Sequence, residues 1–371
     1  MVLEYLVSAE VYGSLFALMA MGLTLTYMTT KVPNFAYGDM VLMGVYSAYV
    51  TVKVYHASPY LGTGVGFVLG GVASVIIYLG ILRPLSRRGA SIVSLMIATF
   101  GADIGFAGLI GIYTDYLTNA YLFPDTKEFY TLTPDFGIAG YPGVDFAAPV
   151  AMLTVVVLIY MLLNKTKFGV TMRAAIENPP LAKILGINVD FVYTVSWFVA
   201  GGLAGFAGAF LTLYLPLLGV NTGNDLIVGI FAASVLGGLM SIFGSAVGGA
   251  IIGGSEILLT IYLGEGFGYV GAAIIAALMV LAGVYAVRKK QLRPRVGGAI
   301  LAALGVWILV DMLTGLQVDL IAPELVNGFG STAVNPFQLG IPLVIMAFTL
   351  LIVPQGIFSL NFRRMLHRER K

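Results

Sequence analysis

The stretch LVSAEVYGSLFALMAMGLTLTYMT, residues Leu6–Thr29, decides the fold class. Glu10 is its one charged side chain, and a helix needs about 20 mostly apolar residues to cross the hydrocarbon core of a bilayer. The whole chain of 371 residues shares this character, because 59% of them are hydrophobic and only 10% are charged. Soluble domains carry about 25% charged residues. The sequence therefore excludes a soluble globule and predicts an all-α, polytopic transmembrane helical bundle.

Apolar runs of comparable character recur along the chain and give the number of expected spans. Since some Gly-rich runs could be re-entrant pairs, we expect about 8–11 spans, with broken or re-entrant helices in two repeat-like halves. Together the runs predict a single transmembrane domain over residues 1–371. They are Leu6–Thr29, Asp39–Tyr55, Leu61–Leu82, Ser91–Tyr113, Ala147–Leu163, Phe191–Leu215, Asp225–Leu239, Phe243–Leu263, Gly268–Val287, Val296–Leu316 and Phe337–Val353.

Clusters of basic residues indicate the orientation of the chain in the membrane. Seventeen of the 20 Lys and Arg residues fall in four clusters, and the runs place two, four and two crossings between successive clusters. All four clusters therefore lie on one face, which the positive-inside rule makes cytoplasmic. We expect a multi-pass protein of the plasma membrane, with the N-terminus outside, the C-terminus cytoplasmic and the acidic loop 114–146 outside. The clusters are Arg83–Arg88, Lys165–Lys183, Arg288–Arg295 and Arg363–Lys371.

Composition also excludes several classes of function. The net charge of +2 offers no basic excess for nucleic acid, so we expect none as a partner. Without cysteine, and with only His56 and His367 as histidines, the chain has no expected metal site or cofactor. No GxxxxGKS/T motif is present, so we expect no P-loop binding of ATP and no enzyme activity in this chain. An intramembrane protease built on Asp103 and Asp311 is only a formal alternative.

Glycine is the second compositional signal, with 47 residues, many of them four positions apart inside apolar runs. Small residues at this spacing let helix backbones approach closely, because lipid supplies no hydrophobic drive for helix association. We expect such packing along Gly201, Gly205 and Ala209, and again along Gly244 and Gly248.

Two polar breaks interrupt the apolar runs, one in each half of the chain. The first, KVPNFAYGD at Lys31–Asp39, contains Pro33, which cannot donate to a helix, and Asn34, which can cap the helix that follows. The second is NTGND at Asn221–Asp225. Breaks of this kind expose helix N-termini suited to an anionic group of a solute, as in transporters with broken helices. Ordinary turns between helices explain the pattern equally well.

Few ionisable residues lie deep inside the predicted spans. Asp103, Glu256 and Asp311 are the clearest cases, and no embedded Lys, Arg or His is available to pair with them. A charge at the bilayer centre costs at least about 2.5–3.5 kcal/mol on insertion scales, so such groups face protein or water. We favour hydrogen bonding within the protein, and keep as an alternative an ion-coupled secondary transporter of a small polar solute.

The cytoplasmic loop 164–190 has the pattern of two short amphipathic helices. The segment Arg173–Glu177 suits one helix, Pro179 suits the first turn of the next, and Gly186 suits its C-terminal end. A merely solvated linker would not need apolar residues such as Leu181 and Leu185. The loop therefore predicts a docking site for another protein.

Three stretches of the chain resemble the permease subunits of branched-chain amino acid ABC transporters, in the wider group for high-affinity uptake of hydrophobic amino acids. The first runs from Gly22 through NFAYGD to Gly44, where the family reads NFAHGE. The second is Arg173–Val189, and the third runs from Ala204 to Glu256. The NFA form resembles the shorter of the two permease types that such transporters pair.

The chain departs from this family at three residues and in one segment. Tyr37 and Asp39 replace His and Glu, and Asp103 lies where the family is usually apolar. Residues 266–336 form an additional helical segment of unknown role.

The resemblance implies a permease subunit of an ABC importer for branched-chain or hydrophobic amino acids, with urea or another amide as the alternative cargo. It implies four kinds of contact: two ABC ATPase subunits, a second permease subunit in a heterodimer, an extracytoplasmic substrate-binding protein and the lipid bilayer. The residues expected at the ATPase dock are Arg173, Glu177, Asn178, Pro179, Leu181, Leu185 and Gly186. Those expected to line the pathway are Asn34, Phe35, Ala36, Tyr37, Gly38, Asp39, Asn221, Asn224 and Asp225.

Overall fold

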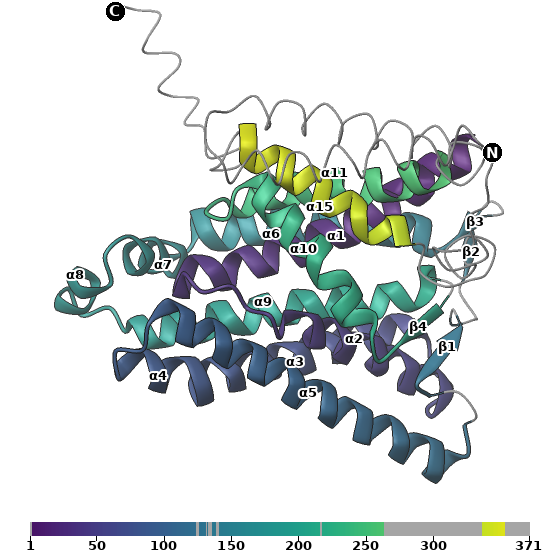
Figure 1. Cartoon of the computed structure of the whole chain (residues 1–371), viewed down its shortest axis with the longest axis horizontal. Coiled ribbons are helices and arrows are strands. Elements are labelled where there is room, and N and C mark those ends of the chain that lie inside the picture. The colour runs from purple at the N-terminus through teal and green to yellow at the C-terminus, as the bar shows by residue number, and fades with distance from the viewer. Residues whose placement is uncertain are drawn as a thin grey trace, which may run out of the picture. The chain divides into compact units, whose positions relative to one another are not determined.

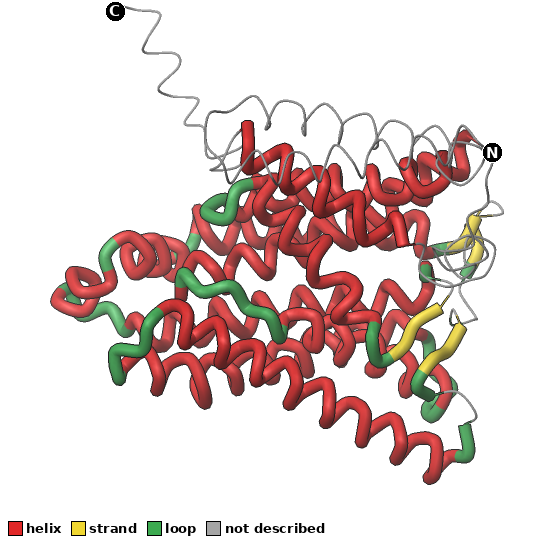
Figure 2. The backbone as a smooth tube through the Cα atoms, viewed as in Figure 1, coloured by secondary structure: helices red, strands yellow, loops and turns green. Residues whose placement is uncertain are grey.

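The computed structural model describes residues 2–262 and 336–352, apart from residues 124–125, 131, 133–135, 139–140 and 216. Helices make up nearly all of this part, and four short strands lie in the loops (Figures 1 and 2). The predicted runs Gly268–Val287 and Val296–Leu316 lie outside the described residues, as do Asp311 and residues 266–335 of the additional segment.

The other nine predicted runs are helical, which confirms the all-α fold class. Six helices are long and apolar enough to cross a membrane: α1, the continuous helix from α3 to α4, α5, α6, α9 and most of α11. The remaining three, α2, α10 and α15, are shorter, and 16 or 17 residues span about 25 Å at the helical rise. The bounds of the principal helices are α1 Val2–Thr30, α2 Tyr37–Lys53, α3 Pro59–Ile77, α5 Ile92–Tyr121, α6 Val144–Lys165, α9 Val189–Tyr214, α10 Thr222–Gly237, α11 Ile242–Tyr262 and α15 Pro336–Ile352.

Short elements connect these helices. A π-helical turn, Tyr78–Leu82, joins α3 to α4, Arg83–Arg87. The two helices of the loop 164–190 are α7, Lys167–Glu177, and α8, Pro179–Ile184. The strands are β1 Glu128–Tyr130, β2 Gly137–Ile138, β3 Tyr141–Pro142 and β4 Leu217–Gly219.

The first polar break separates α1 from α2 as predicted, but its capping residue differs. Lys31 ends α1 in the left-handed region, with φ at 57°. The N-cap of α2 is Ala36, and no side chain caps that helix. The predicted cap by Asn34 is therefore wrong, because the helix begins two residues later than a cap at Asn34 requires. The Asn34 amide is fully buried instead.

Glycine contacts hold α2, α3 and α9 together, as the small-residue spacing predicted. A Cβ on Gly205 of α9 would overlap the backbone of Gly66 on α3, and a Cβ on Gly44 of α2 would overlap the Gly205 carbonyl. One turn along α9, Gly201 has the same relation to Gly70. These three helices share the closest helix packing of the described chain because no side chain separates their backbones.

The loops gather at opposite ends of the bundle. Helices α7 and α8 lie together at one end, whereas all four strands lie at the other (Figure 1). Strand β1 pairs antiparallel with β4, which joins the acidic loop to the segment before the second break. Helix α5 continues to Tyr121, so the first eight residues of the predicted loop 114–146 are helical. Polar side chains among them bond within the protein: the Thr114 hydroxyl donates to the Gly111 carbonyl at 2.7 Å, and the Thr118 hydroxyl donates to the Thr114 carbonyl at 3.1 Å.

Candidate functional site

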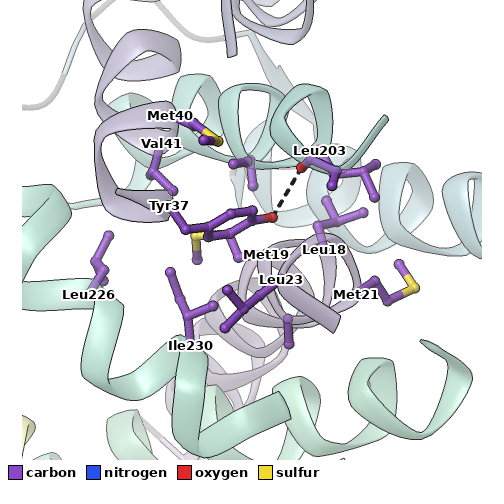
Figure 3. Packing of buried hydrophobic residues seen from close by; sticks show 14 of the residues in the cluster. Leu18, Met19, Met21, Leu23, Tyr37, Met40, Val41, Leu203, Leu226 and Ile230 are labelled. Atoms are coloured by element: carbon purple, nitrogen blue, oxygen red, sulfur yellow. Dashed lines mark hydrogen bonds between the residues drawn. The ribbon is translucent and has the colours of Figure 1, made fainter. Parts of the chain in front are cut away.

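Helix α2 packs against α3, α9 and α10 and begins with three of the residues predicted for the pathway, Tyr37, Gly38 and Asp39. Ala36 and Tyr37 are fully buried. The Tyr37 hydroxyl donates to the Ala200 carbonyl of α9 at 3.1 Å. Figure 3 shows the Tyr37 ring among apolar side chains of α1, α2 and α10, including Leu23 and Ile230. Tyr37 therefore ties three helices to α2, and its role in the pathway stays a prediction.

The two polar breaks, far apart in the sequence, meet at a glycine pair. A Cβ on Gly38 of α2 would overlap the Gly223 carbonyl at the start of α10, and a Cβ on Gly223 would meet the Gly38 carbonyl at 2.5 Å. Asn221 is the N-cap of α10 without a capping side-chain bond, and Asn224 and Asp225 lie in its first turn. The structure thus brings the first turns of α2 and α10 into direct backbone contact.

Phe35 of the first break lies against two other helices. Its ring packs edge-on against Phe100 of α5, with centroids 6.3 Å apart. It also packs, at a tilt, against Phe231 of α10, with centroids 5.6 Å apart. The Phe35 amide donates to Thr99 Oγ1 at 3.4 Å, and the Thr99 hydroxyl is 3.3 Å from the Pro33 carbonyl. Helix α5 therefore covers the first break.

One turn further along both helices, Asp39 of α2 and Asp103 of α5 form a carboxyl pair. Their side chains interact with each other directly, and both residues are at least nine-tenths buried. No donor on a described residue reaches Asp39 Oδ2 or Asp103 Oδ1. Each aspartate stands out separately in the sequence, but nothing in the sequence indicates that the two form a pair. In the structure their offset of 64 residues equals the offset between Phe35 and Thr99, which also lie in contact.

A cavity of about 640 Å³ lies between α2, α3 and α5 on the far side of this pair from Phe35. Its walls are almost entirely apolar and aromatic. The lining residues are Met43, Tyr46, Ser47, Val50, Thr51, Tyr55, Ala57, Leu61, Val65, Leu69, Phe106, Leu109, Ile110 and Tyr113.

The other embedded carboxyl in the described chain is part of the packing between helices. Glu256 of α11 accepts a hydrogen bond from the Tyr12 hydroxyl of α1 at 3.3 Å. This contact matches the expected hydrogen bonding within the protein. Among the described residues, no three Asp, Glu or His side chains form a group that could hold a metal ion.

The loop 164–190 folds as the two predicted helices. The Asn178 side chain accepts from the Leu181 amide at 3.1 Å and so caps α8, whose first residue is Pro179. Gly186 follows the C-cap Leu185 with φ at +81°, which favours glycine. Arg173 donates to the Leu163 carbonyl at 2.5 Å and so fastens α7 to the end of α6.

Helix α8 leaves a row of apolar side chains uncovered. Leu181 is 50% exposed, Ile184 81% and Leu185 70%. Glu177 and Asn178 are exposed beside them. Exposed apolar residues that lie together on a connecting loop mark an interaction surface.

Two contacts connect this loop to the membrane helices. The Tyr193 hydroxyl of α9 donates to the Ala175 carbonyl of α7 at 2.9 Å. Asp190 at the start of α9 accepts from Arg83 at 2.8 Å and from Arg87 at 2.5 Å, both on α4. These contacts join α7 to α9, and the start of α9 to α4, which continues from α3.

The fold defines a class: a polytopic membrane protein built almost entirely of helices, six of them long and apolar enough to cross a bilayer. Residues 5–283 match the family described as "Branched-chain amino acid transport system / permease component". The chain belongs to this family. Embedding in the plasma membrane as a multi-pass protein follows from the family and from the six apolar helices.

Individual relatives agree with this assignment. A probable branched-chain amino acid transport permease protein, LivH, of Methanocaldococcus jannaschii is 42% identical over 72% of this chain and 83% of its own length. The high-affinity branched-chain amino acid permease LivH of Escherichia coli is 25% identical over 75% of this chain and 92% of its own. The ribose import permease RbsC of Bacillus subtilis is 30% identical over 53% and 60%. No solved structure matches the chain.

Proposed function

We propose that this chain is a transmembrane permease subunit of an ABC importer for branched-chain and other hydrophobic amino acids. The observation that carries the proposal is the similarity over most of both chains to a permease named for branched-chain amino acid transport. The central position of the first break and the exposed α8 surface support it. The pathway would run along the breaks where Gly38 meets Gly223.

Energy would come from separate ATPase subunits that bind the α7–α8 loop. The exposed side chains of Leu181, Ile184 and Leu185 offer the apolar part of such an interface, and Glu177 and Asn178 offer its polar edge. The cap of Asn178 and the turn at Gly186 hold this surface in one conformation. Two ATPases would be needed, one on this chain and one on a second permease subunit.

The opposite end of the bundle would face the outside and receive solute from an extracytoplasmic binding protein. The sheet of β1 and β4 lies at this end (Figure 1). It joins the acidic loop to the start of α10, next to the glycine pair. With α7 and α8 cytoplasmic, the N-terminus would be outside and the C-terminus inside.

An uptake assay in cells tests this proposal. Cells that depend on this transport system should accumulate labelled leucine with the wild-type chain and lose the uptake when Asn178–Leu185 is deleted or Glu177 is replaced by Lys. The protein should remain in the membrane in each case. Unchanged uptake would reject the docking role, and uptake of urea without leucine would replace the proposed cargo.

A further inference from the structure

Helices α2 and α5 run in the same direction with a fixed register in the region of the carboxyl pair. Phe35 lies opposite Thr99, and Asp39 lies opposite Asp103. One turn later, Met43 of α2 and Phe106 of α5 line the cavity. Residues three or four apart lie on one face of a helix, so one face of α5 carries Phe100, Asp103 and Phe106. One face of α2 carries Asp39 and Met43, and Phe35 lies just before the start of this helix.

Three layers therefore follow each other along these faces. The first is the aromatic cluster of Phe35, Phe100 and Phe231. The second is the carboxyl pair, and the third is the apolar cavity of about 640 Å³. The cavity has room for a small apolar group, and the aromatic cluster lies at the opposite side of the carboxyl pair.

No described residue donates a hydrogen bond to Asp39 Oδ2 or Asp103 Oδ1 of the carboxyl pair. A hydrogen bond between two carboxyl groups needs at least one proton, because a carboxylate has no hydrogen to donate. With one proton shared between them, the two groups carry one negative charge. A buried negative charge without a donor is costly unless a positive group binds beside it.

A second polar group in the same break also lacks a partner. Both polar atoms of the Asn34 amide are buried, and no described residue hydrogen-bonds to either. Buried polar atoms without partners in a folded protein call for an explanation such as a bound ligand or water. Asn34 is therefore a third buried polar side chain at the first break whose hydrogen bonds the described residues do not supply.

We propose that Asp39 and Asp103 bind the ammonium group of the transported solute, while its apolar side chain occupies the cavity that Met43 and Phe106 line. The positive ammonium group offers three donors to a pair that has one negative charge and no other donor. The inference rests on the proposed function for the identity of the solute as an apolar amino acid. It assigns Asp103, an acidic residue inside a predicted span, to solute recognition in this chain.

A cysteine reporter in the cavity tests the inference, since the chain contains no native cysteine. The assembled transporter with Met43→Cys is reconstituted in nanodiscs and labelled with a membrane-permeant thiol reagent. Three probes are compared: leucine, 3-methylbutylamine, which lacks the carboxylate, and 4-methylpentanoate, which lacks the ammonium group. The control reporter is Gly105→Cys on α5, where an added Cβ meets nothing within 4 Å.

We expect leucine and 3-methylbutylamine to slow labelling of Met43→Cys, and 4-methylpentanoate to leave it unchanged. Gly105→Cys should be unprotected by all three. Adding Asp103→Asn should weaken protection by the amine about tenfold or more, as expected for a hydrogen bond to a charged group. Asp103→Glu, which keeps the charge, should retain protection. Asp39→Asn provides a second variant if Asp103→Asn does not assemble.

Equal protection by all three probes would overturn the inference and mark the cavity as an apolar groove for lipid or a partner helix. Protection by none of them, or full protection by the amine in both Asp→Asn variants, would also overturn it. ATP-driven leucine uptake by the wild-type assembly is measured in parallel in proteoliposomes. Uptake without probe protection rejects this site alone, whereas absence of uptake rejects the proposed function.

Discussion

Gly38 and Gly223, 185 positions apart, are in backbone contact, and each lacks room for a Cβ beside the other's carbonyl group. This contact places the first turn of α2 against the first turn of α10. Each helix begins in a polar break, so one glycine pair joins the two interruptions in the apolar pattern of the chain.

Replacing Gly38 by Ala should therefore destabilise the protein. A methyl group at this position must push two backbones apart, and overpacking of this kind costs about 1–3 kcal/mol. The thermal midpoint of the purified protein in detergent should fall. Gly64→Ala on α3, where an added Cβ meets nothing within 4 Å, is the matched control and should not lower it. Equal midpoints for the two variants would show that the contact is not tight in the protein.

Tyr37→Phe separates a packing role of Tyr37 from a role in the pathway. Loss of the hydrogen bond to the Ala200 carbonyl should lower the free energy of unfolding by about 0.5–1.5 kcal/mol and leave the affinity for solute unchanged. Tyr116→Phe, at an exposed position on α5, is the control for stability. A changed solute affinity with unchanged stability would instead place the Tyr37 hydroxyl in the pathway.

The exposed surface of α8 gives a prediction about coupling. Ile184→Asp should stop solute-stimulated ATP hydrolysis by the assembled transporter, because it introduces a charge into an apolar interface. The thermal midpoint of the isolated chain should stay the same, since Ile184 is 81% exposed. Lys183→Gln, at the neighbouring exposed position, should keep coupling. Normal stimulation in Ile184→Asp would exclude this surface as the ATPase dock.

The carboxylate of Asp190 holds two arginines of unequal exposure. The Arg83 side chain is 33% exposed and that of Arg87 62%, so Arg83→Gln should destabilise the protein more than Arg87→Gln. Both effects should be within about 1 kcal/mol, and both should shrink at high salt. Lys127→Gln breaks the more exposed pair with Asp115 and should change the thermal midpoint least. A larger loss of stability in Arg87→Gln than in Arg83→Gln would contradict this ranking by side-chain exposure.

Much of the fold could be predicted from local pattern. Apolar runs gave the helices because a bilayer requires long stretches without charge, and the small-residue spacing on α9 indicated close packing with a neighbour. The ends of α8 followed from Pro179 and Gly186, whose conformational preferences act within a few residues.

Contacts between segments far apart in the chain could not be predicted from the sequence. Neither the contact of Gly38 with Gly223 nor the pairing of Asp39 with Asp103 has a local signal, because each depends on which helices become neighbours. The end of α5 was placed too early because Thr114 and Asp115 have the composition of a loop. In the structure Thr114 bonds inside the protein and the helix continues past it.

Reconstitution of transport tests the central claim most directly. Proteoliposomes that contain this chain, its second permease, the two ATPases and the binding protein should concentrate labelled leucine only when ATP is present on the α8 side. The chain alone, given a proton or sodium gradient, should not concentrate leucine. Accumulation by the chain alone on an ion gradient would contradict the account and identify a secondary transporter.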